Sequence, residues 1–569
     1  MTTFISPMGY LPGTMHRTFE TSTRRRGRTL DGQWQFVTAP DGEGYEENYA
    51  EQFPVEAAEP VAVPSAWNSR DAYEDYVGPA WYRRTFDLDD PTSVLLTFHG
   101  VGHDATVFLD GEEVASHEGG FTPFSALGRE LSTGRHELVV RADNRLRETT
   151  VPAADADFFP YGGIYREVVI EEVPEVYVRD LSLAYDLDGD DATVEAEVTV
   201  HNVGAETAEP ELWVSVGEQS TGREVEVFGM DATTEALSLT VEDVDRWSPD
   251  EPRLYDAVAR LARDEGDVTG RRFFDDHWDR VGFREVAVEG RDLLVNGEPT
   301  TLAGVVRRED HPDWGRAQPL QIQRRDVDAL DEAGFTAVRT RSPVHPRLLD
   351  ICDEAGLLVV EDIPLSGVDR GTANSVAERA QRTLVQTVER DGDHPAVVGW
   401  CLADDCATDD STVVSTVETL RAVATGLDDS RPVAVASSVD WDDAHDAAFE
   451  SCDLLFANGP RGRAADRAAW ADHFDRLESD YGEKPIVASR VRAAARSDDE
   501  DPDDGADGLA DVLDLCLDRE SVAGFAVDQF ADTRPVLDDA DQPAEGIVTD
   551  YRQPRPAYRT VAELLDSRP

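Results

Sequence analysis

The distribution of apolar and polar positions divides the 569-residue chain into three regions. In residues 1–173, short segments of alternating apolar and polar side chains are separated by turn signals such as Asp110-Gly111 and Thr133-Gly134. The segments are Trp81–Leu88, Ser93–Phe98, Ala105–Leu109, His136–Arg141 and Tyr165–Ile170. This pattern predicts an all-β domain, a jelly-roll sandwich.

Residues 174–282 repeat the alternating pattern on a smaller scale. The candidate strands are Tyr177–Tyr185, Ala192–Asn202, Glu211–Val216 and Ala257–Leu261. Their number and spacing predict a second β-sandwich of roughly immunoglobulin size.

In residues 283–569 short apolar runs alternate with amphipathic helical patterns. Eight runs read as strands: Thr301–Val306, Phe335–Thr340, Leu357–Glu361, Ala396–Leu402, Pro432–Ser437, Leu454–Ala457, Pro485–Ser489 and Val522–Val527. Helical patterns between them include Arg324–Ala333, Arg347–Ala355, Ser375–Arg390 and Ala464–Ser479. Eight such units predict a closed (β/α)8 barrel of the TIM type. An open doubly wound sheet is the alternative, but no strand is followed by a Gly-rich phosphate loop.

The fourth of these strands ends abruptly in two acids. The stretch DHPAVVGWCLADDC, residues 393–406, runs apolar to Leu402 and then reaches Asp404 and Asp405. In a parallel barrel the C-terminal ends of the strands carry the chemistry, so both carboxylates are candidate site residues. The alternative is that the two acids cap the N-terminus of the next helix.

The charge balance excludes several classes of partner. Lys and Arg number 53 against 117 Asp and Glu, a formal net charge of -64, and Lys484 is the only lysine. Such a chain repels nucleic acid and anionic membranes. An excess of carboxylates spread along the whole chain is typical of a protein from a high-salt cytoplasm, where salt screens the self-repulsion. We therefore attribute the acidity to habitat and not to function.

The cysteines and the N-terminal region favour a cytoplasmic protein. The five cysteines are odd in number and absent from the first 351 residues, which indicates reduced, buried thiols. Arg24-Arg25-Arg26 resembles a twin-arginine export signal, but no apolar segment follows it. No apolar run reaches the length of a membrane span.

Motifs along nearly the whole chain resemble glycoside hydrolase family 2, the group of β-galactosidases, β-glucuronidases and β-mannosidases. In the first region they are Leu30-Asp31-Gly32, Val63-Pro64-Ser65 with Trp67-Asn68, Trp81-Tyr82-Arg83-Arg84 and Tyr161-Gly162-Gly163-Ile164-Tyr165-Arg166. In the third they include Val281-Gly282-Phe283-Arg284, Glu309-Asp310-His311-Pro312, Ala337-Val338-Arg339-Thr340 and Cys352-Asp353-Glu354-Ala355-Gly356-Leu357. The resemblance implies a jelly roll, an immunoglobulin-like sandwich and a barrel that cleaves β-glycosides.

The two catalytic positions depart from the family pattern. Retaining glycosidases use one carboxyl as acid/base and a second, about 5 to 5.5 Å away, as nucleophile. The family's Asn-Glu acid/base motif aligns with Asp404-Asp405, so Asp405 takes the acid/base position. The family's nucleophile, in a Ser-Glu motif after Lys-Pro-Ile, aligns with Arg490. A guanidinium has no available lone pair and stays protonated, so the resemblance predicts loss of double displacement.

Other positions that line the sugar pocket in the family have also changed. The family's Gly-Val-Asn-Arg-His-Glu is Gly304-Val305-Val306-Arg307-Arg308-Glu309 here, and its Ser-His-Tyr is Arg341-Ser342-Pro343. We expect the remaining polar groups at strand ends to line the pocket and contact a carbohydrate ligand. These are Arg307, Glu309, Arg339, Asp362, Asp404 and Asn458.

Three functions remain open on the sequence: a non-hydrolytic carbohydrate-binding or assembly subunit, a hydrolase with a rearranged site, and a purely structural role in which Arg490 pairs with Asp404 or Asp405 across the barrel mouth and locks it shut. The rearranged site would use Asp405 with Asp362, Glu309 or Asp404. We predict no cofactor and no metal, because Arg308 disfavours a cation beside Glu309, and His311 and His394 fit hydrogen-bonded structure better. A homo-oligomer is compatible with the sequence.

Overall fold

The computed structural model describes residues 21–154, 156–264, 271–437, 446–460, 465–492, 502–534 and 546–568. Its chain forms two compact units. Of the described residues, the smaller unit contains 21–28, 171–244 and 254–281, and the larger contains those within 29–170, 245–253 and 282–569. Among the described residues, no helix is long and apolar enough to cross a membrane.

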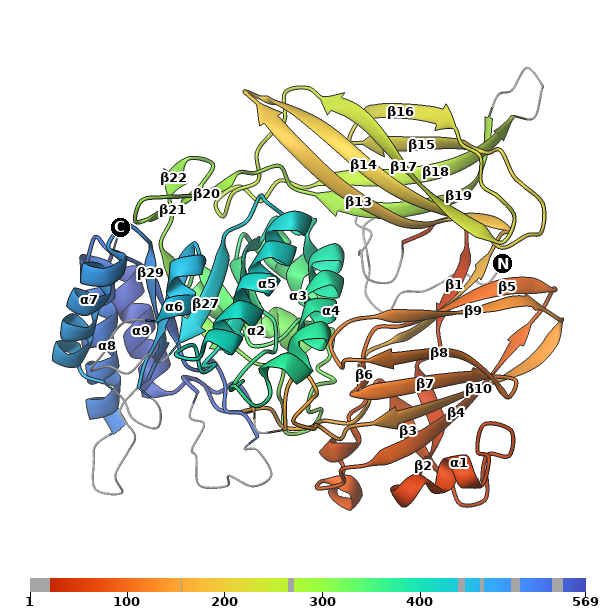
Figure 1. The fold of residues 1–569 in the computed structure, drawn as a ribbon, viewed down its shortest axis with the longest axis horizontal. Coiled ribbons are helices and arrows are strands. Elements are labelled where there is room, and N and C mark those ends of the chain that lie inside the picture. The colour runs from red at the N-terminus through yellow and green to blue at the C-terminus, as the bar shows by residue number, and fades with distance from the viewer. Residues whose placement is uncertain are drawn as a thin grey trace. The chain divides into compact units, whose positions relative to one another are not determined.

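The smaller unit is the predicted immunoglobulin-like sandwich (Figure 1). One sheet has the order β13 (Val176–Asp188), β14 (Asp191–Asn202), β17 (Asp231–Val241). The other has the order β16 (Gln219–Glu224), β15 (Glu211–Val216), β18 (Tyr255–Asp264), β19 (Arg271–Val281). In β14 every second side chain is buried, which is why its alternating sequence forms a strand with one face in the core.

The larger unit begins with the predicted jelly roll. Its six-stranded sheet has the order β3 (Glu59–Val63), β2 (Gly32–Thr38), β4 (Pro79–Leu88), β10 (Gly134–Asp143), β7 (Asp104–Leu109), β8 (Glu112–Glu118). The facing sheet contains β12 (Val168–Val173), β5 (Thr92–Phe98) and β9 (Phe124–Leu131), and the short elements are β1 (Arg26–Thr29), α1 (Glu43–Glu46), β6 (Val101–Gly102) and β11 (Gly163–Ile164). Trp34, Trp67 and Tyr82 are buried between the sheets.

One predicted strand of the jelly roll is wrong in its bounds. We predicted a strand over Tyr165–Ile170, but β11 ends at Ile164 and β12 begins only at Val168, so the first three residues of the predicted strand connect two strands. The backbone N–H groups of Tyr165 and Arg166 both donate to the Gly100 carbonyl, which turns the chain between the two strands.

The barrel closes in chain order, as predicted for the TIM type, so the open doubly wound alternative is wrong. Its strands are β23 (Leu302–Arg307), β24 (Ala337–Thr340), β25 (Leu358–Asp362), β26 (Val397–Asp404), β27 (Val433–Ser437), β28 (Leu454–Asn458), β29 (Ile486–Val491) and β30 (Val522–Val527). A small three-stranded sheet of β20 (Val286–Glu289), β21 (Asp292–Val295) and β22 (Glu298–Pro299) precedes them.

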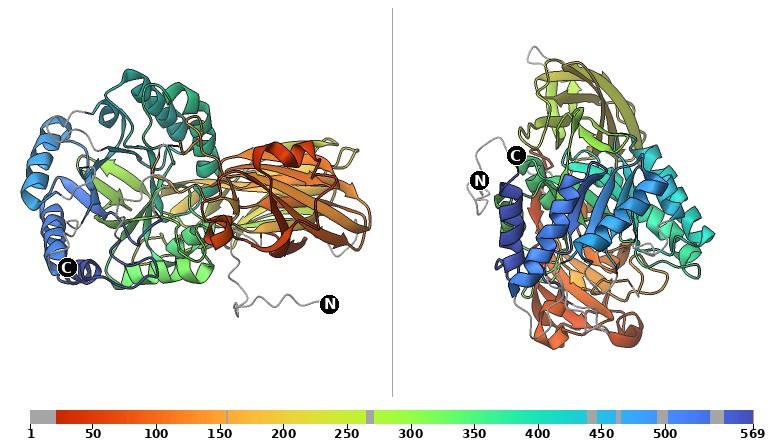
Figure 2. Two further views of the ribbon diagram at one scale, coloured as in Figure 1. Left: turned by 90° about the horizontal axis from the view of Figure 1, so that it is seen from below. Right: turned by 90° about the vertical axis from the view of Figure 1, so that its left-hand side faces the viewer.

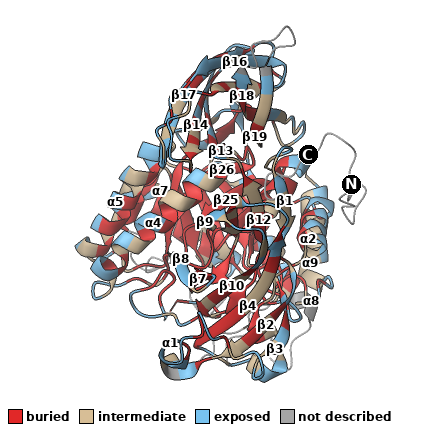
Figure 3. Cartoon of the chain, turned by 90° about the vertical axis from the view of Figure 1, so that its right-hand side faces the viewer, coloured by how far each residue is buried: buried red, intermediate tan, exposed pale blue. Residues whose placement is uncertain are grey.

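Helices cover the outside of the barrel, as the left view of Figure 2 shows. They are α2 (Leu320–Glu332), α3 (Pro346–Ala355), α4 (Ala373–Asp391), α5 (Ser411–Leu427), α6 (Ala447–Ser451), α7 (Arg467–Tyr481), α8 (Pro502–Asp518) and α9 (Pro556–Asp566). The strands are buried on both faces, which explains their continuous apolar runs (Figure 3). The predicted start of one helix at Ala464 lies outside the described residues, and α7 begins at Arg467.

The single lysine of the chain has a structural role in the barrel. The Lys484 ammonium donates hydrogen bonds to the carbonyl oxygens of Phe449 (2.8 Å), Glu450 (2.8 Å) and Cys452 (2.7 Å) at the end of α6. An ammonium carries three donors on one atom, whereas the planar guanidinium spreads its donors over a fork. Three carbonyls converging on one point therefore require lysine.

We expect the substitution Lys484→Arg to lower the free energy of unfolding by about 1 to 3 kcal/mol, because the fork leaves at least one of the three carbonyls without a donor. Arg135→Lys, at a side chain that is 72% exposed, is the matched control and should change it by less than about 0.5 kcal/mol. Urea unfolding of both variants measures the difference. Equal stability of Lys484→Arg and the wild type would show that the three carbonyls do not select lysine.

Candidate functional site

The two acids at the end of β26 are fixed by the backbone of neighbouring strands. The Asp404 N–H donates to the Leu365 carbonyl and the Asp405 N–H to the Ala436 carbonyl, both at 2.9 Å. Both side chains are buried in the mouth of the barrel. The helix-capping alternative is wrong, because Asp410 is the N-cap of α5 and its side chain accepts from the Thr412 N–H.

Arg490 bridges these two acids. It lies on β29, and its guanidinium donates through Nη2 to Asp404 Oδ2 at 2.9 Å and through Nη1 to Asp405 Oδ2. Only 13% of the Arg490 side chain is exposed, and about 3% of each carboxylate side chain. The cation and the acid that the sequence predicts at the two catalytic positions therefore form a buried ion pair.

Two further arginines approach Asp404. Arg341 Nη1 lies 2.5 Å and Arg339 Nη2 lies 3.4 Å from the same Oδ2 atom that Arg490 binds. Three guanidinium groups thus meet at one carboxylate oxygen. Arg341 follows β24, and no signal in the sequence marked it as a ligand of Asp404.

Arg339 also holds Asp362 and Ser489. Its Nε and Nη2 donate to the two oxygens of Asp362 at 3.0 and 2.7 Å, and its Nη1 donates to Ser489 Oγ at 2.8 Å. Asn458 completes the group, since its Nδ2 donates to Oδ1 of Asp404 at 2.8 Å and of Asp405 at 3.0 Å. The structure therefore brings together Arg339, Asp362, Asp404, Asp405, Asn458 and Arg490.

Charge, more than burial, sets the protonation state of Asp404. Burial alone would raise the pKa of this carboxyl, but the guanidinium groups of Arg341, Arg490 and Arg339 lower it far below its usual range. Asp362 behaves differently, because burial raises its pKa to about 6 against the opposing effect of Arg339. Asp404 is therefore a permanent acceptor and not a proton donor near neutral pH.

The backbone is in the left-handed region at both positions that the sequence predicts as catalytic. The angle φ is +52° at Asp405 and +50° at Arg490, and neither residue is glycine. Such conformations cost about 1 to 3 kcal/mol and persist only where the surrounding structure imposes them. The ion pair between the two side chains therefore joins two strained backbone positions.

A second ring of ion pairs lies around this group and was not predicted. Arg308 donates to the Asp157 carboxylate at 2.5 Å and Arg492 to the Asp528 carboxylate at 2.5 Å. Burial raises the pKa of Asp157 and Asp528, but the neighbouring arginines outweigh it and lower both, that of Asp528 to about 2. Asp157 belongs to the jelly-roll region, and only the folded structure shows that it reaches the barrel mouth.

Arg307 and Glu309 lie outside the group around Asp404. Because Val306 is the register partner of Arg339, the next residue, Arg307, points to the opposite face of the barrel wall, where it donates to Asp326 at 2.9 Å. Glu309 accepts from Arg166 of the jelly roll at 3.0 Å and from the His345 N–H at 2.8 Å. Burial would raise its pKa, but Arg166, Arg307 and His345 lower it to about 2. Their expected contact with a ligand stays a prediction.

The two histidines differ in their surroundings. The rings of Trp314 and Tyr551 pack against His311, with centroids 4.3 and 5.5 Å away. His394 Nδ1 lies 2.5 Å from Asp353 Oδ2, and Asp350 is close enough to complete a metal-sized group. Asp350 and Asp353 are one helical turn apart on α3, and they approach His394 only through the fold.

A cleft of about 850 Å³ lies at the other end of the barrel. Its lining includes Pro432 and Asp453, each directly before a barrel strand, and Lys484, two residues before β29. The N-terminal ends of barrel strands contribute to stability, whereas the C-terminal ends carry the chemistry. We therefore place the candidate site at the mouth around Asp404, in spite of the size of this cleft.

Comparison with known families matches each region of the chain. Residues 28–174 match the sequence model "Glycosyl hydrolases family 2, sugar binding domain", residues 176–284 match "Glycosyl hydrolases family 2", and residues 286–494 match "Glycosyl hydrolases family 2, TIM barrel domain". The chain belongs to glycosyl hydrolase family 2. Its fold is the family scaffold, as the sequence motifs predicted.

Individual relatives are β-glycosidases. A β-glucuronidase of Paenibacillus borealis is 28% identical over 461 residues, covering 73% of each chain. A β-glucuronidase of Canis lupus familiaris is 27% identical and covers 94% of this chain and 90% of its own. A crystal structure of a β-galacturonidase from Eisenbergiella tayi bound to galacturonate has a TM-score of 0.85 at 26% identity, covering 98% of this chain and 100% of its own.

We expect Arg490→Met to lower the free energy of unfolding at pH 7 by about 3 to 5 kcal/mol, because it leaves two buried carboxylates with fewer cations. Arg490→Glu should lower the free energy of unfolding further, since it adds a third carboxylate, and Arg490→Lys should lower it less than Arg490→Met does. Chemical unfolding of the three variants measures the order.

The cost of Arg490→Met should depend on pH. The folded pKa of Asp404 lies below its unfolded value, so its stabilising contribution is complete above about pH 4 and is lost as the pH falls further. The difference between Arg490→Met and the wild type should therefore narrow below about pH 4. A difference that stays constant between pH 7 and pH 3 would contradict a charge-based origin.

Proposed function

We propose that this glycosyl hydrolase family 2 member binds carbohydrate at the barrel mouth without hydrolysing it by the family's retaining mechanism. The observation that carries the proposal is the ion pair of Arg490 with Asp404 and Asp405. The residues expected to contact the ligand are Arg339, Asp362, Asp404, Asp405, Asn458 and Arg490.

The chemistry of the ion pair argues against double displacement. The first step needs a carboxylate that attacks the anomeric carbon, and Arg490 offers no lone pair for that attack. The same step needs an acid at Asp405 that can reach the departing oxygen, but an Asp405 oxygen accepts a hydrogen bond from Arg490 instead. One substitution therefore opposes both halves of the reaction.

The arginines of the mouth favour an anionic sugar as ligand. Nε of Arg308 and Nε of Arg490 are buried and have no hydrogen-bond partner within the described part of the chain. Burial lowers the pKa of Arg341 to about 10, and although Asp404 opposes this shift, the charges of Arg490, Arg308 and Arg339 add to it. A ligand carboxylate would relieve this crowding of cations and accept from the two free donors.

Several of the relatives point to the same class of ligand. β-Glucuronidases and a β-galacturonidase are among them, beside β-galactosidases, and glucuronate and galacturonate are uronic acids with a carboxylate in place of the primary hydroxyl. We therefore propose a uronic acid, free or at the end of a glycan, as the ligand. We propose that binding takes place in the high-salt cytoplasm that the sequence predicts for this protein.

A hydrolase with a rearranged site is the second candidate, favoured by the raised pKa of Asp362. A carboxyl with a pKa of about 6 suits an acid/base role near neutral pH. Both oxygens of Asp362 accept from Arg339, however, so a substrate would first have to displace that arginine. If such hydrolysis occurs through an activated water, the released sugar should have the inverted anomeric configuration.

We expect no turnover of aryl β-glucuronides, β-galacturonides, β-galactosides or β-mannosides by the wild-type protein in high salt. The triple variant Arg490→Glu, Asp404→Asn, Asp405→Glu restores the family's residues at all three positions and serves as the positive control. Turnover by the triple variant alone supports the proposal. Robust hydrolysis by the wild type would overturn it, and NMR of the product anomer would then test the second candidate.

Binding should be selective for the carboxylate. Isothermal titration should give measurable affinity for galacturonate or glucuronate. Galactose and glucose should bind at least about tenfold more weakly, because they lack the carboxylate and lose one charge-assisted hydrogen bond. Arg308→Gln, which removes a charge from the mouth but not the Asp404 pair, should weaken uronate binding. Equal affinity for charged and neutral sugars would contradict an anionic ligand.

A further inference from the structure

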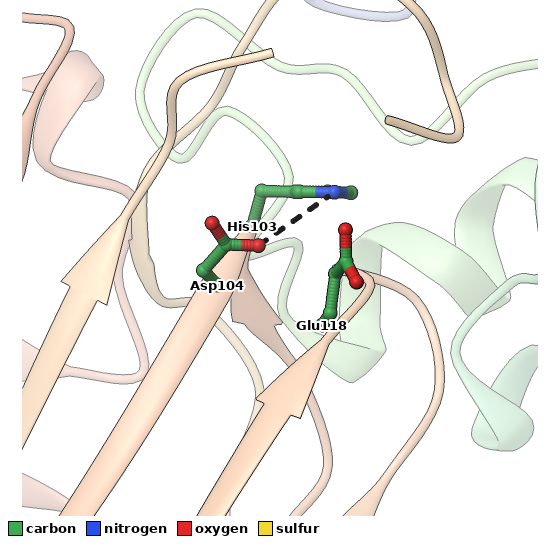
Figure 4. A group of neighbouring side chains, drawn as sticks. All are labelled: His103, Asp104 and Glu118. Atoms are coloured by element: carbon green, nitrogen blue, oxygen red, sulfur yellow. Dashed lines mark ion pairs between the residues drawn. The ribbon is translucent and has the colours of Figure 1, made fainter. Parts of the chain in front are cut away.

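Three potential metal ligands meet at one end of the six-stranded jelly-roll sheet. His103 directly precedes β7, Asp104 is the first residue of β7, and Glu118 is the last residue of β8. Figure 4 shows the three side chains gathered beyond the strand ends. One ligand atom from each of them lies within 4.8 Å of the other two. We refer to these residues as the strand-end cluster.

The register of the strands puts like charges side by side in this cluster. Asp104 is the direct cross-strand partner of Glu118 on β8 and of Asp143 on β10, so three carboxylates form a row across three strands. Like charges directly opposite each other destabilise an antiparallel pair. A row of this kind therefore needs cations, which must come from arginines or from a bound ion.

Arginines satisfy only the outer parts of the row. Arg141 and Arg145 hold Asp143 at 2.6 and 2.5 Å, so this acid is fully paired. Arg147 lies 3.4 Å from Asp104 Oδ2. On Glu118, the Arg379 guanidinium binds Oε1, while Arg382 stays 3.6 Å from Oε2. Arg147 and Arg382 are each about half exposed, so solvent screens both contacts.

Two inner atoms of the cluster remain without a partner. His103 Nε2 and Asp104 Oδ1 are buried and make no hydrogen bond to any residue that the structure describes. The two atoms are 3.9 Å apart, which is too long for a direct hydrogen bond, and the whole His103 residue is only 4% exposed. Leaving a buried polar group unsatisfied is costly, so the arrangement calls for a species that both atoms can bind.

We propose that the strand-end cluster binds one divalent transition-metal ion of the zinc class through His103 Nε2, Asp104 Oδ1 and Glu118 Oε2. Zinc accepts both imidazole nitrogen and carboxylate oxygen ligands, whereas calcium and magnesium prefer oxygen ligands alone. Zinc–ligand bonds of about 2.0 to 2.2 Å require the three atoms to approach by roughly 1 Å, which side-chain rotation provides. Arg379 remains on Glu118 Oε1 as an outer partner.

The ion would have a structural role. Arg379 and Arg382 belong to α4 of the barrel, so Glu118 connects the jelly-roll strands with the barrel helix layer inside the larger unit. A metal ion at this point would fix β7 and β8 relative to each other and hold Glu118 in place for α4. This role is independent of the sugar chemistry at the barrel mouth.

Titration of the chelator-treated full chain with zinc chloride tests the proposal. We expect one zinc ion per chain by calorimetry and elemental analysis, and a higher melting temperature with zinc than without. His103→Gln should weaken zinc binding by at least about tenfold, by analogy with losses at metal-site positions. His117→Gln removes the neighbouring histidine, whose side chain leaves β8 on the opposite face, and should bind zinc like the wild type.

Asp104→Asn separates a metal site from a merely structural contact. Without zinc this variant should melt at the wild-type temperature or above it, because it removes a carboxylate from the row of like charges. With zinc it should lose most of the stabilisation that the wild type gains. Absence of stoichiometric zinc binding, or zinc binding of wild-type strength in both His103→Gln and Asp104→Asn, would overturn the proposal. Binding of calcium or magnesium in preference to zinc would overturn it as well.

Discussion

The barrel mouth depends on the pairing of Arg490 with Asp404 and Asp405. Charges buried at this depth lose their hydration, and only close opposite charges with good hydrogen-bond geometry offset that loss. Five arginines and five aspartates meet here: Arg308, Arg339, Arg341, Arg490 and Arg492 with Asp157, Asp362, Asp404, Asp405 and Asp528. Each of these side chains has an opposite charge as partner. Removing Arg490 would leave the central pair of acids exposed to mutual repulsion.

Arginine is the cation that this environment requires. A guanidinium can donate to two carboxylates at once, as Arg490 does, or to both oxygens of one, as Arg339 does with Asp362. In a chain with 117 acids and a single lysine, the buried carboxylates of the mouth are therefore paired with the guanidinium groups of arginines. Lys484 is the exception because its three acceptors converge on a single point.

The sequence predicts the architecture well and the mouth only in part. Runs such as Val522–Val527 and their turn residues report local burial, which is why the eight barrel strands could be found within a few residues of their true bounds. The contact between Arg490 and the acids of β26 followed from the family resemblance and the barrel geometry. Asp157 could not be found in this way, because it reaches Arg308 from another region of the chain and no local pattern encodes that contact. Arg307 was expected to line the pocket because it lies at a strand end. Its side chain instead points to the outer face of the barrel and donates to Asp326, because successive residues of a strand point to opposite faces.

The departures from the family pattern are coupled in space. The resemblance aligns a neutral Asn with Asp404, a carboxylate nucleophile with Arg490 and a Ser with Arg341, so the three positions carry one new negative and two new positive side chains. All three meet at Asp404 Oδ2, which Arg341 Nη1 approaches to 2.5 Å and Arg490 Nη2 to 2.9 Å. Decay of an unused site would leave at least one of these buried charges without a partner, at a cost of several kcal/mol. The left-handed backbone at Asp405 and Arg490 adds a further energetic cost at the same place. The three changed side chains therefore compensate one another in charge within the barrel mouth.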